Sequence, residues 1–64
     1  DPRPEGCAAA VPPGWEPHLV RRGDTAYRLA VTLGITVDTI AAVNCLSDPN
    51  YLREGQALLL PPAP

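Results

Sequence analysis

The apolar residues between positions 26 and 33 recur with the spacing of a helix. They stand at i, i+3, i+4 and i+7 and give a two-turn helix one apolar face: Ala26, Leu29, Ala30 and Leu33. Asp24 or Thr25 can cap this helix, because either side-chain oxygen can accept hydrogen bonds from N–H groups of the first turn. Gly34 follows where helices commonly end in a left-handed residue. We therefore predict a helix over residues 26–33.

A second helix is predicted directly after the first. Thr36 can cap it, and Asp38 lies in its first turn, where a negative charge interacts favourably with the helix dipole. The positions expected to face the core are Val37, Ile40, Ala41 and either Val43 or Asn44. Because its β-branched residues lower the intrinsic helix propensity, packing against the rest of the molecule must hold this helix in place.

Two short strands are predicted on either side of the helices. The segment HLVR, residues 18–21, is followed by Gly23, and the segment QALLLP, residues 56–61, ends in prolines. The segment SDPN, residues 47–50, has the composition of a turn. Two strands separated by a pair of helices most simply pair antiparallel. We therefore predict an α+β fold of order β-α-α-β, in which two short helices cover one face of a two-stranded antiparallel sheet.

The prolines divide the chain into an arm and one small domain. Residues 1–17 contain five of the nine prolines, so this arm is expected to be extended or irregular. The domain is expected over residues 18–62, followed by a tail at 63–64. Trp15, in the arm, either covers the edge of a thin core or offers a surface on which a sugar ring can stack. A domain of this size buries only about 60% of its unfolded surface, so its stability is marginal without a cross-link.

The two cysteines, Cys7 and Cys45, are read as a disulfide, with two separate buried thiols as the alternative. A zinc site needs four ligands at short spacings, which the single histidine and these cysteines do not offer, so no metal or other cofactor is expected. The disulfide would stabilise the fold by about 3–4 kcal/mol and tie the arm to the domain. It would also place the protein outside the cytoplasm, as a secreted, periplasmic or cell-wall-associated protein.

Charge and size argue against several functions. The net charge of −2 argues against nucleic acid as a partner, and no apolar run reaches the ~20 residues of a membrane span. Covalent catalysis needs a nucleophile beside a base, yet His18 is alone on its strand. A carboxylate pair such as Glu16 and Asp24 would lack a deep cleft to enclose a substrate. We therefore expect no enzyme activity and no catalytic residues in this chain.

From His18 to Pro62, about 45 of the 64 residues, the sequence resembles a LysM domain. The resemblance rests on separated blocks in matching order: His-x-Val at 18–20, GDT at 23–25, LA at 29–30, GITVDTI at 34–40, Asn44, and L-x-x-GQ-x-L-x-LP at 52–61. It implies the β-α-α-β fold reached above from the pattern. It also implies non-catalytic binding of glycans that contain N-acetylglucosamine, namely peptidoglycan or chitin, with peptidoglycan favoured. Such a module would anchor a parent protein, for example one with a cell-wall hydrolase domain, to the wall.

The resemblance further implies a shallow groove between two loops at one end of the molecule, one from Gly23 to Tyr27 and the other from Ser47 to Leu52. The expected glycan-binding residues are Gly23, Asp24, Thr25, Ala26, Tyr27, Ser47, Pro49, Asn50, Tyr51 and Leu52. Gly23 allows a sharp turn and a close approach of the backbone to a ligand. Ala26 and Leu52 would form an apolar floor.

The two tyrosines and two departures from the family pattern leave alternatives open. Tyr51 either stacks on a pyranose ring or covers the edge of the domain, whereas Tyr27 is expected beside the core. Ala26 stands where the family commonly has leucine, and Cys45 where it commonly has glycine. An arm tied through Cys45 would either extend the groove or partly block it. The alternative function is a protein-interaction or self-association module on the same fold, and the chain is expected to be a monomer or to self-associate weakly.

Overall fold

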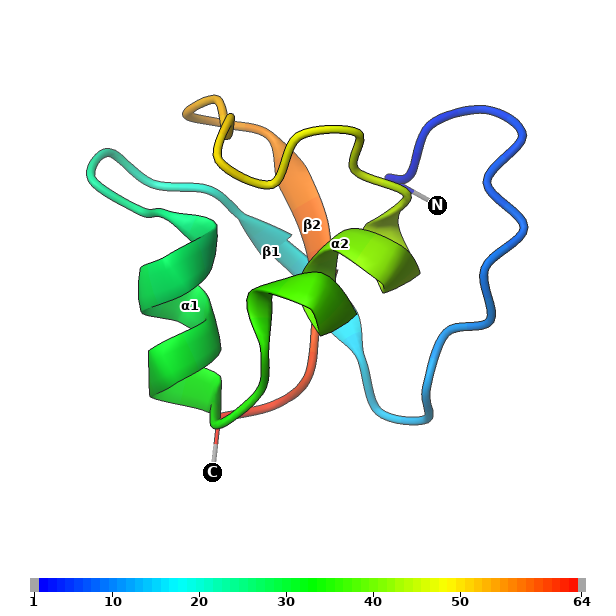
Figure 1. Ribbon diagram of the computed structural model, residues 1–64, viewed down its shortest axis with the longest axis horizontal. Helices are drawn as coiled ribbons and strands as arrows, with labels where there is room; N and C mark the ends of the chain where they lie inside the picture. The colour runs from blue at the N-terminus through cyan, green and yellow to red at the C-terminus, as the bar shows by residue number, and fades with distance from the viewer. Residues whose placement is uncertain (1, 64) are drawn as a thin grey trace.

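A two-stranded antiparallel sheet and two helices follow one another in the order β1-α1-α2-β2 in the computed structural model, which describes residues 2–63 (Figure 1). The elements are β1 (Glu16–Leu19), α1 (Ala26–Leu33), α2 (Val37–Asn44) and β2 (Ala57–Leu60). The predicted fold class and both predicted helices are confirmed. Residues 1 and 64, which belong to the predicted arm and tail, lie outside the described part.

The first strand begins at Glu16, two residues before the predicted start at His18. Glu16 pairs with Leu60 and Pro17 with Leu59. Proline is tolerated here because Leu59 directs both its N–H and its C=O to the side chain of Asn44 instead of to β1. The missing N–H of Pro17 therefore removes no bond from the sheet, as expected of proline in an edge strand.

Pairing between the two chain segments continues past the end of β1. The N–H of Val20 donates to the carbonyl of Gln56 at 2.7 Å, and the N–H of Gly55 donates to the carbonyl of Val20 at 2.8 Å. These bonds fix the segment that follows β1 against the turn that precedes β2.

The first helix begins and ends as the sequence predicts, and the second begins at the predicted cap. The Thr25 hydroxyl accepts from the Arg28 N–H at 3.1 Å and caps α1, and Gly34 ends this helix with a φ of 72°. The Thr36 hydroxyl caps α2 by accepting from the Thr39 N–H at 3.1 Å. Because Asp24 is not the cap of α1, its carboxylate is available to the preceding turn.

The apolar faces of the helices and the sheet meet in one core. Its buried members come from the end of β1, from both helices and from β2: Val20, Ala30, Ile40, Leu58 and Leu60. Half-buried side chains pack around them: Leu29, Leu33, Ile35, Val37, Leu46 and Leu52. Trp15 is half-buried and is not among these packed side chains.

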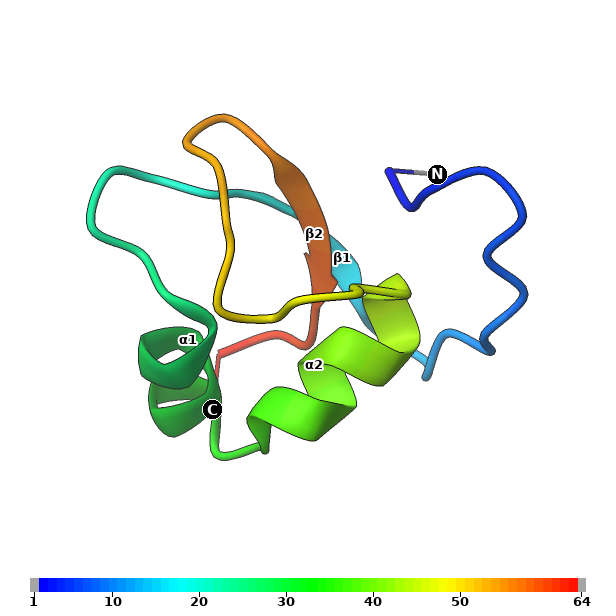
Figure 2. The same cartoon turned by 45° about the horizontal axis from the view of Figure 1, so that its top comes forward.

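A disulfide joins Cys7 to Cys45, with the two Cα atoms 5.9 Å apart, which confirms the predicted pairing. Cys45 also ends α2 in a left-handed conformation, with a φ of 55°. Traced from β1 back towards the N-terminus, the arm makes a wide loop and returns to the C-terminal end of α2 (Figure 2). There the guanidinium of Arg3 donates to the carbonyl of Val43 at 3.2 Å.

Neither described helix is long and apolar enough by itself to cross a membrane. Taken together, α1 and α2 meet that length and composition, but the pair bends by 109° at the break between them.

Candidate functional site

The two loops that the sequence singles out lie at the same end of the molecule. Figures 1 and 2 both place the connection from β1 to α1 beside the connection from α2 to β2. Val20 belongs to the first connection and Gly55 to the second, and the hydrogen bond between them joins the two connections. Leu52 packs against the core cluster that contains Val20 and so joins the second loop to the body of the domain. The structure thus brings the two predicted groups of residues together.

The first loop is a hydrogen-bonded turn that ends in a helix cap. The Asp24 N–H donates to the Arg21 carbonyl at 3.0 Å, while the Asp24 carboxylate accepts from the Arg21 N–H at 2.9 Å. Gly23 lies inside this turn with a φ of 88°, a conformation that favours glycine. Together with the Thr25 cap, these bonds hold the turn and its junction with α1.

The carboxylate of Asp24 has a second neighbour, the imidazole of His18 on β1. Nε2 of His18 lies 3.5 Å from Oδ2 of Asp24, so a protonated His18 forms an ion pair with it. The hydrogen bond from the Arg21 N–H, followed by the interaction with His18, lowers the pKa of Asp24 below its ordinary value. The role of Asp24 that the structure supports is therefore to hold the first loop.

The second loop is built on Asp48. Oδ1 of Asp48 accepts from the Asn50 N–H at 3.0 Å, and its carbonyl accepts from the Tyr51 N–H at 3.1 Å. This arrangement is the Asx turn that aspartate favours before proline. A further turn follows at once, in which the Arg53 N–H donates to Oε1 of Gln56 at 2.9 Å. The second loop is therefore also held by its own hydrogen bonds.

The side chains predicted to contact a ligand differ greatly in accessibility. Tyr51 is 68% exposed, so its ring is free to meet a ligand. Leu52 is half-buried, and Ala26 is only 3% exposed, so Ala26 offers little side-chain surface to an apolar floor. Five further predicted side chains remain partly or fully accessible in the loops: Asp24, Thr25, Ser47, Pro49 and Asn50.

The expectation that Tyr27 lies beside the core is wrong. Tyr27 is 71% exposed, because it follows Ala26 in α1 and so points away from the stripe formed by Ala26 and Ala30. Val31, one helical turn later, is exposed on the same side. Tyr27 therefore belongs to the solvent face of α1, next to the first loop.

Four arginines surround the two loops, and all four are exposed: Arg21, Arg22, Arg28 and Arg53. Between residues 2 and 63 none of these guanidinium groups forms an ion pair with a carboxylate. Three carboxylates, those of Asp24, Asp48 and Glu54, lie in the same connections, so the arginines exceed them by one at this end of the molecule, although the whole chain has a net charge of −2.

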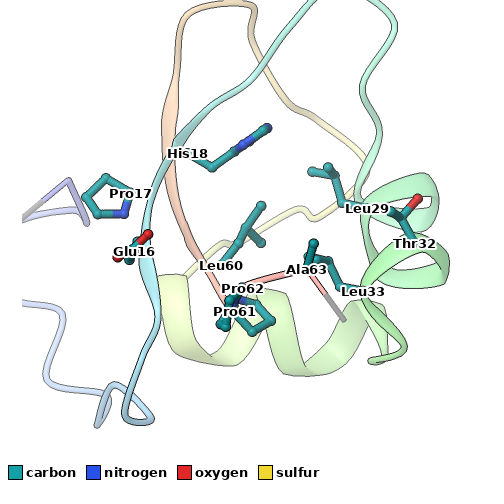
Figure 3. A pocket seen from close by; sticks show the side chains of 10 residues that line it. All are labelled: Glu16, Pro17, His18, Leu29, Thr32, Leu33, Leu60, Pro61, Pro62 and Ala63. Carbon is teal, nitrogen blue, oxygen red and sulfur yellow. The ribbon is translucent and has the colours of Figure 1, made fainter.

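An apolar hollow of about 310 Å³ lies elsewhere, between β1, α1 and the C-terminal segment (Figure 3). Leucine and proline side chains make up most of its lining: Leu29, Leu33, Leu60, Pro61 and Pro62. Glu16, His18 and Thr32 are the polar residues around it. This hollow was not predicted, because it depends on how Pro61 and Pro62 direct the chain back past α1. It contains none of the loop residues.

Comparison with known proteins gives one family and several relatives. A family model described as "LysM domain" matches residues 18–61. The chain is 36% identical over 53 residues, 83% of its length, to the N-acetylmuramoyl-L-alanine amidase XlyB of Bacillus subtilis (strain 168). It is 36% identical over 47 residues, 73% of its length, to the amidase XlyA of the same strain.

A third relative is a lipoprotein. The chain is 42% identical over 43 residues, 67% of its length, to the uncharacterized lipoprotein YgeR of Escherichia coli (strain K12). The matched segments make up 17% of XlyB, 16% of XlyA and 17% of YgeR, so the chain spans less than a fifth of each of these relatives. No solved structure matches the chain significantly.

Proposed function

Because this chain belongs to the LysM domain family, we propose that it binds glycans containing N-acetylglucosamine without cleaving them and anchors a longer parent protein to the cell wall. The observation that carries this proposal is the position of the two loops. Each is fixed by its own hydrogen bonds, and both lie at the same end of the molecule. Binding to such a surface loses little conformational entropy, because the loops are ordered before the ligand arrives.

The chemistry of the loops suits an acetamido group, which offers one hydrogen-bond donor, one acceptor and one methyl group. In the first turn of α1, the hydroxyl of Thr25 accepts a hydrogen bond from the Arg28 N–H, and its carbonyl accepts one from the Leu29 N–H. The N–H group of Tyr27, an exposed residue, has no partner among the described residues and can donate to the acetyl oxygen. Leu52 offers apolar contact to the methyl group, and the exposed ring of Tyr51 can stack on a pyranose face.

Peptidoglycan is proposed as the preferred glycan over chitin. Its peptide stems carry carboxylates, whereas chitin is uncharged. The arginines around the first loop, Arg21, Arg22 and Arg28, outnumber its one carboxylate, Asp24, and would attract the charged polymer. The names of the two amidase relatives also specify an N-acetylmuramoyl-L-alanine bond.

An extracytoplasmic location follows from the same proposal. The disulfide between Cys7 and Cys45 is stable in oxidising compartments, and one relative is a lipoprotein. Since the chain matches less than a fifth of the amidases, an amidase or other hydrolase activity would belong to another part of a parent protein.

Parallel calorimetric titrations test this function. The chain is titrated with chitin oligomers, with peptide-free peptidoglycan oligomers and with the same oligomers carrying stem peptides. We expect weak binding to all three, strengthened by stem peptides at low salt and less so at high salt. Equal affinity with and without stem peptides would contradict the preference for peptidoglycan but not glycan binding itself. No binding to any glycan, together with a molecular size that rises with protein concentration, would contradict glycan binding and favour self-association.

A further inference from the structure

A second hollow borders the second loop, on the side where the N-terminal arm returns. In Figures 1 and 2 the second loop lies between the first loop and the arm. The hollow has a volume of about 430 Å³, within the roughly 300–1,000 Å³ typical of ligand pockets. Its lining combines the arm, the end of α2 and the second loop: Pro4, Cys45, Leu46, Ser47, Asp48, Tyr51, Arg53 and Gln56. No residue of the first loop lines it.

The polar groups in this hollow have unused hydrogen-bonding capacity. Asp48 uses Oδ1 for the Asn50 N–H, which leaves Oδ2 as an acceptor. Gln56 uses Oε1 for the Arg53 N–H, so its amide NH₂ remains as a donor. The guanidinium of Arg53 forms no ion pair within residues 2–63. Planar groups of this kind can bond two neighbouring hydroxyls of a sugar at once.

The lining also has the apolar and charge properties that an uncharged sugar needs. Tyr51 is 68% exposed and presents an aromatic face, on which the C–H face of a pyranose can stack. Asp48 and Arg53 carry opposite charges, so the hollow favours neither an anion nor a cation. A neutral ligand with many hydroxyls and one apolar face matches this lining best.

The outer wall of the hollow depends on the disulfide. The Cys7 N–H donates to the Pro4 carbonyl at 3.1 Å, which couples Pro4 to the cross-linked residue. Cys7 is bonded to Cys45 at the end of α2, and Arg3 donates to the carbonyl of Val43 in the same helix. Pro4 is therefore held beside the second loop by the two residues of the arm that flank it, Arg3 and the cross-linked Cys7.

We propose that this hollow is a second sugar subsite, which binds a further N-acetylated pyranose of the glycan that the two loops bind, and that the disulfide-tethered arm forms its wall. The subsite rests on the proposed function, because its ligand is the continuation of the same polysaccharide. It explains why a proline-rich arm, with little core of its own, is cross-linked at the start of the second loop.

The test measures affinity for N-acetylglucosamine oligomers of increasing length, from two to eight residues. For the unmodified chain we expect affinity to increase by about tenfold at the length that first reaches the second hollow. Arg53→Ala should bind the shortest oligomers as the unmodified chain does and lack this increase. Glu54→Ala is the matched control, since Glu54 is adjacent and exposed but does not line the hollow, and it should keep the increase.

A double variant, Cys7→Ser with Cys45→Gly, releases the wall and should also lose the increase. If this variant does not fold, Arg53→Ala decides alone. An increase that persists in Arg53→Ala, or loss of short-oligomer binding in that variant, would overturn the second subsite while leaving the proposed function intact. If the unmodified chain binds oligomers of no length, the proposed function fails, and the subsite fails with it.

Discussion

At the scale of single residues, Asn44 joins α2 to β2 through its side-chain amide. The Asn44 NH₂ donates to the carbonyls of Ile40 and Leu59, both at 2.9 Å, and its oxygen accepts from the Leu59 N–H at 2.7 Å. The side chain is 2% exposed. Buried polar groups are tolerated when their hydrogen bonds are satisfied, and here three bonds satisfy the amide and the outer edge of β2 together.

Replacing Asn44 should therefore destabilise the fold strongly. In Asn44→Ala the N–H and C=O of Leu59 remain buried without partners, so we expect the free energy of unfolding to fall by about 2–4 kcal/mol in urea titrations. Asn50→Ala is the control, because Asn50 is exposed and only its backbone N–H is bonded, and it should change stability by less than about 0.5 kcal/mol. Equal effects of the two substitutions would contradict the assigned role of Asn44.

Asp24 makes the stability of the fold depend on pH in the acid range. Because the folded state lowers the pKa of Asp24, its stabilising contribution is complete above the unfolded pKa of about 4 and is lost as pH falls through the folded pKa. Asp24→Asn should be less stable than the unmodified chain near neutral pH, and the two stabilities should converge below about pH 4. Urea titrations at several pH values measure this. Parallel pH curves would show that Asp24 gains nothing from Arg21 and His18.

At the scale of elements, the sequence predicts the helices well because their ends are decided locally. The residues that set these ends act through hydrogen bonds or backbone conformations within a few residues: Thr25, Thr36 and Gly34. The residue types at these positions are therefore enough to predict where the helices begin or end. The start of β1 was predicted two residues late for the opposite reason. Pro17 reads as part of a proline-rich arm, and only the pairing of Leu59 with Asn44 shows why the sheet accepts it.

The end of α2 combines a helix cap with a cross-link. Cys45 has a φ of 55°, a conformation that costs a non-glycine residue about 1–2 kcal/mol. This cost is smaller than the roughly 3–4 kcal/mol expected from closing the loop between Cys7 and Cys45. The stabilisation by the disulfide therefore exceeds the cost of the left-handed conformation of Cys45.

Two double variants separate these effects. Cys7→Ser with Cys45→Ser should lower the free energy of unfolding by about 3–4 kcal/mol, because the cross-link is lost and the strained backbone is kept. Cys7→Ser with Cys45→Gly should recover about 1 kcal/mol of that loss, because glycine adopts a positive φ readily. Thermal or urea unfolding of the pair measures the difference. A glycine variant no more stable than the serine variant would show that the left-handed cap is not strained.

At the scale of the whole molecule, the order β-α-α-β explains why the two loops meet. In an antiparallel pair, the chain leaves β1 at the end where it later enters β2, so the connections at that end lie close together. This part of the candidate site follows from the sequence once the element order is known. Tyr27 was misplaced although the apolar face of α1 was predicted correctly, because Tyr27 lies at the margin of that face, where the sequence does not show whether the ring packs inward or outward. The hollow beside Pro4 could not be predicted, since it depends on where the cross-linked arm lies.

The central claim is that both loops contact one glycan, and chemical-shift mapping tests it most directly. An N-acetylglucosamine tetramer is titrated into the ¹⁵N-labelled chain while the backbone amides are followed by NMR. We predict that amides in residues 23–27 and 47–52 shift together, with a single dissociation constant, while those lining the hollow of Figure 3 do not. Shifts confined to one loop, or centred on that apolar hollow, would contradict the account.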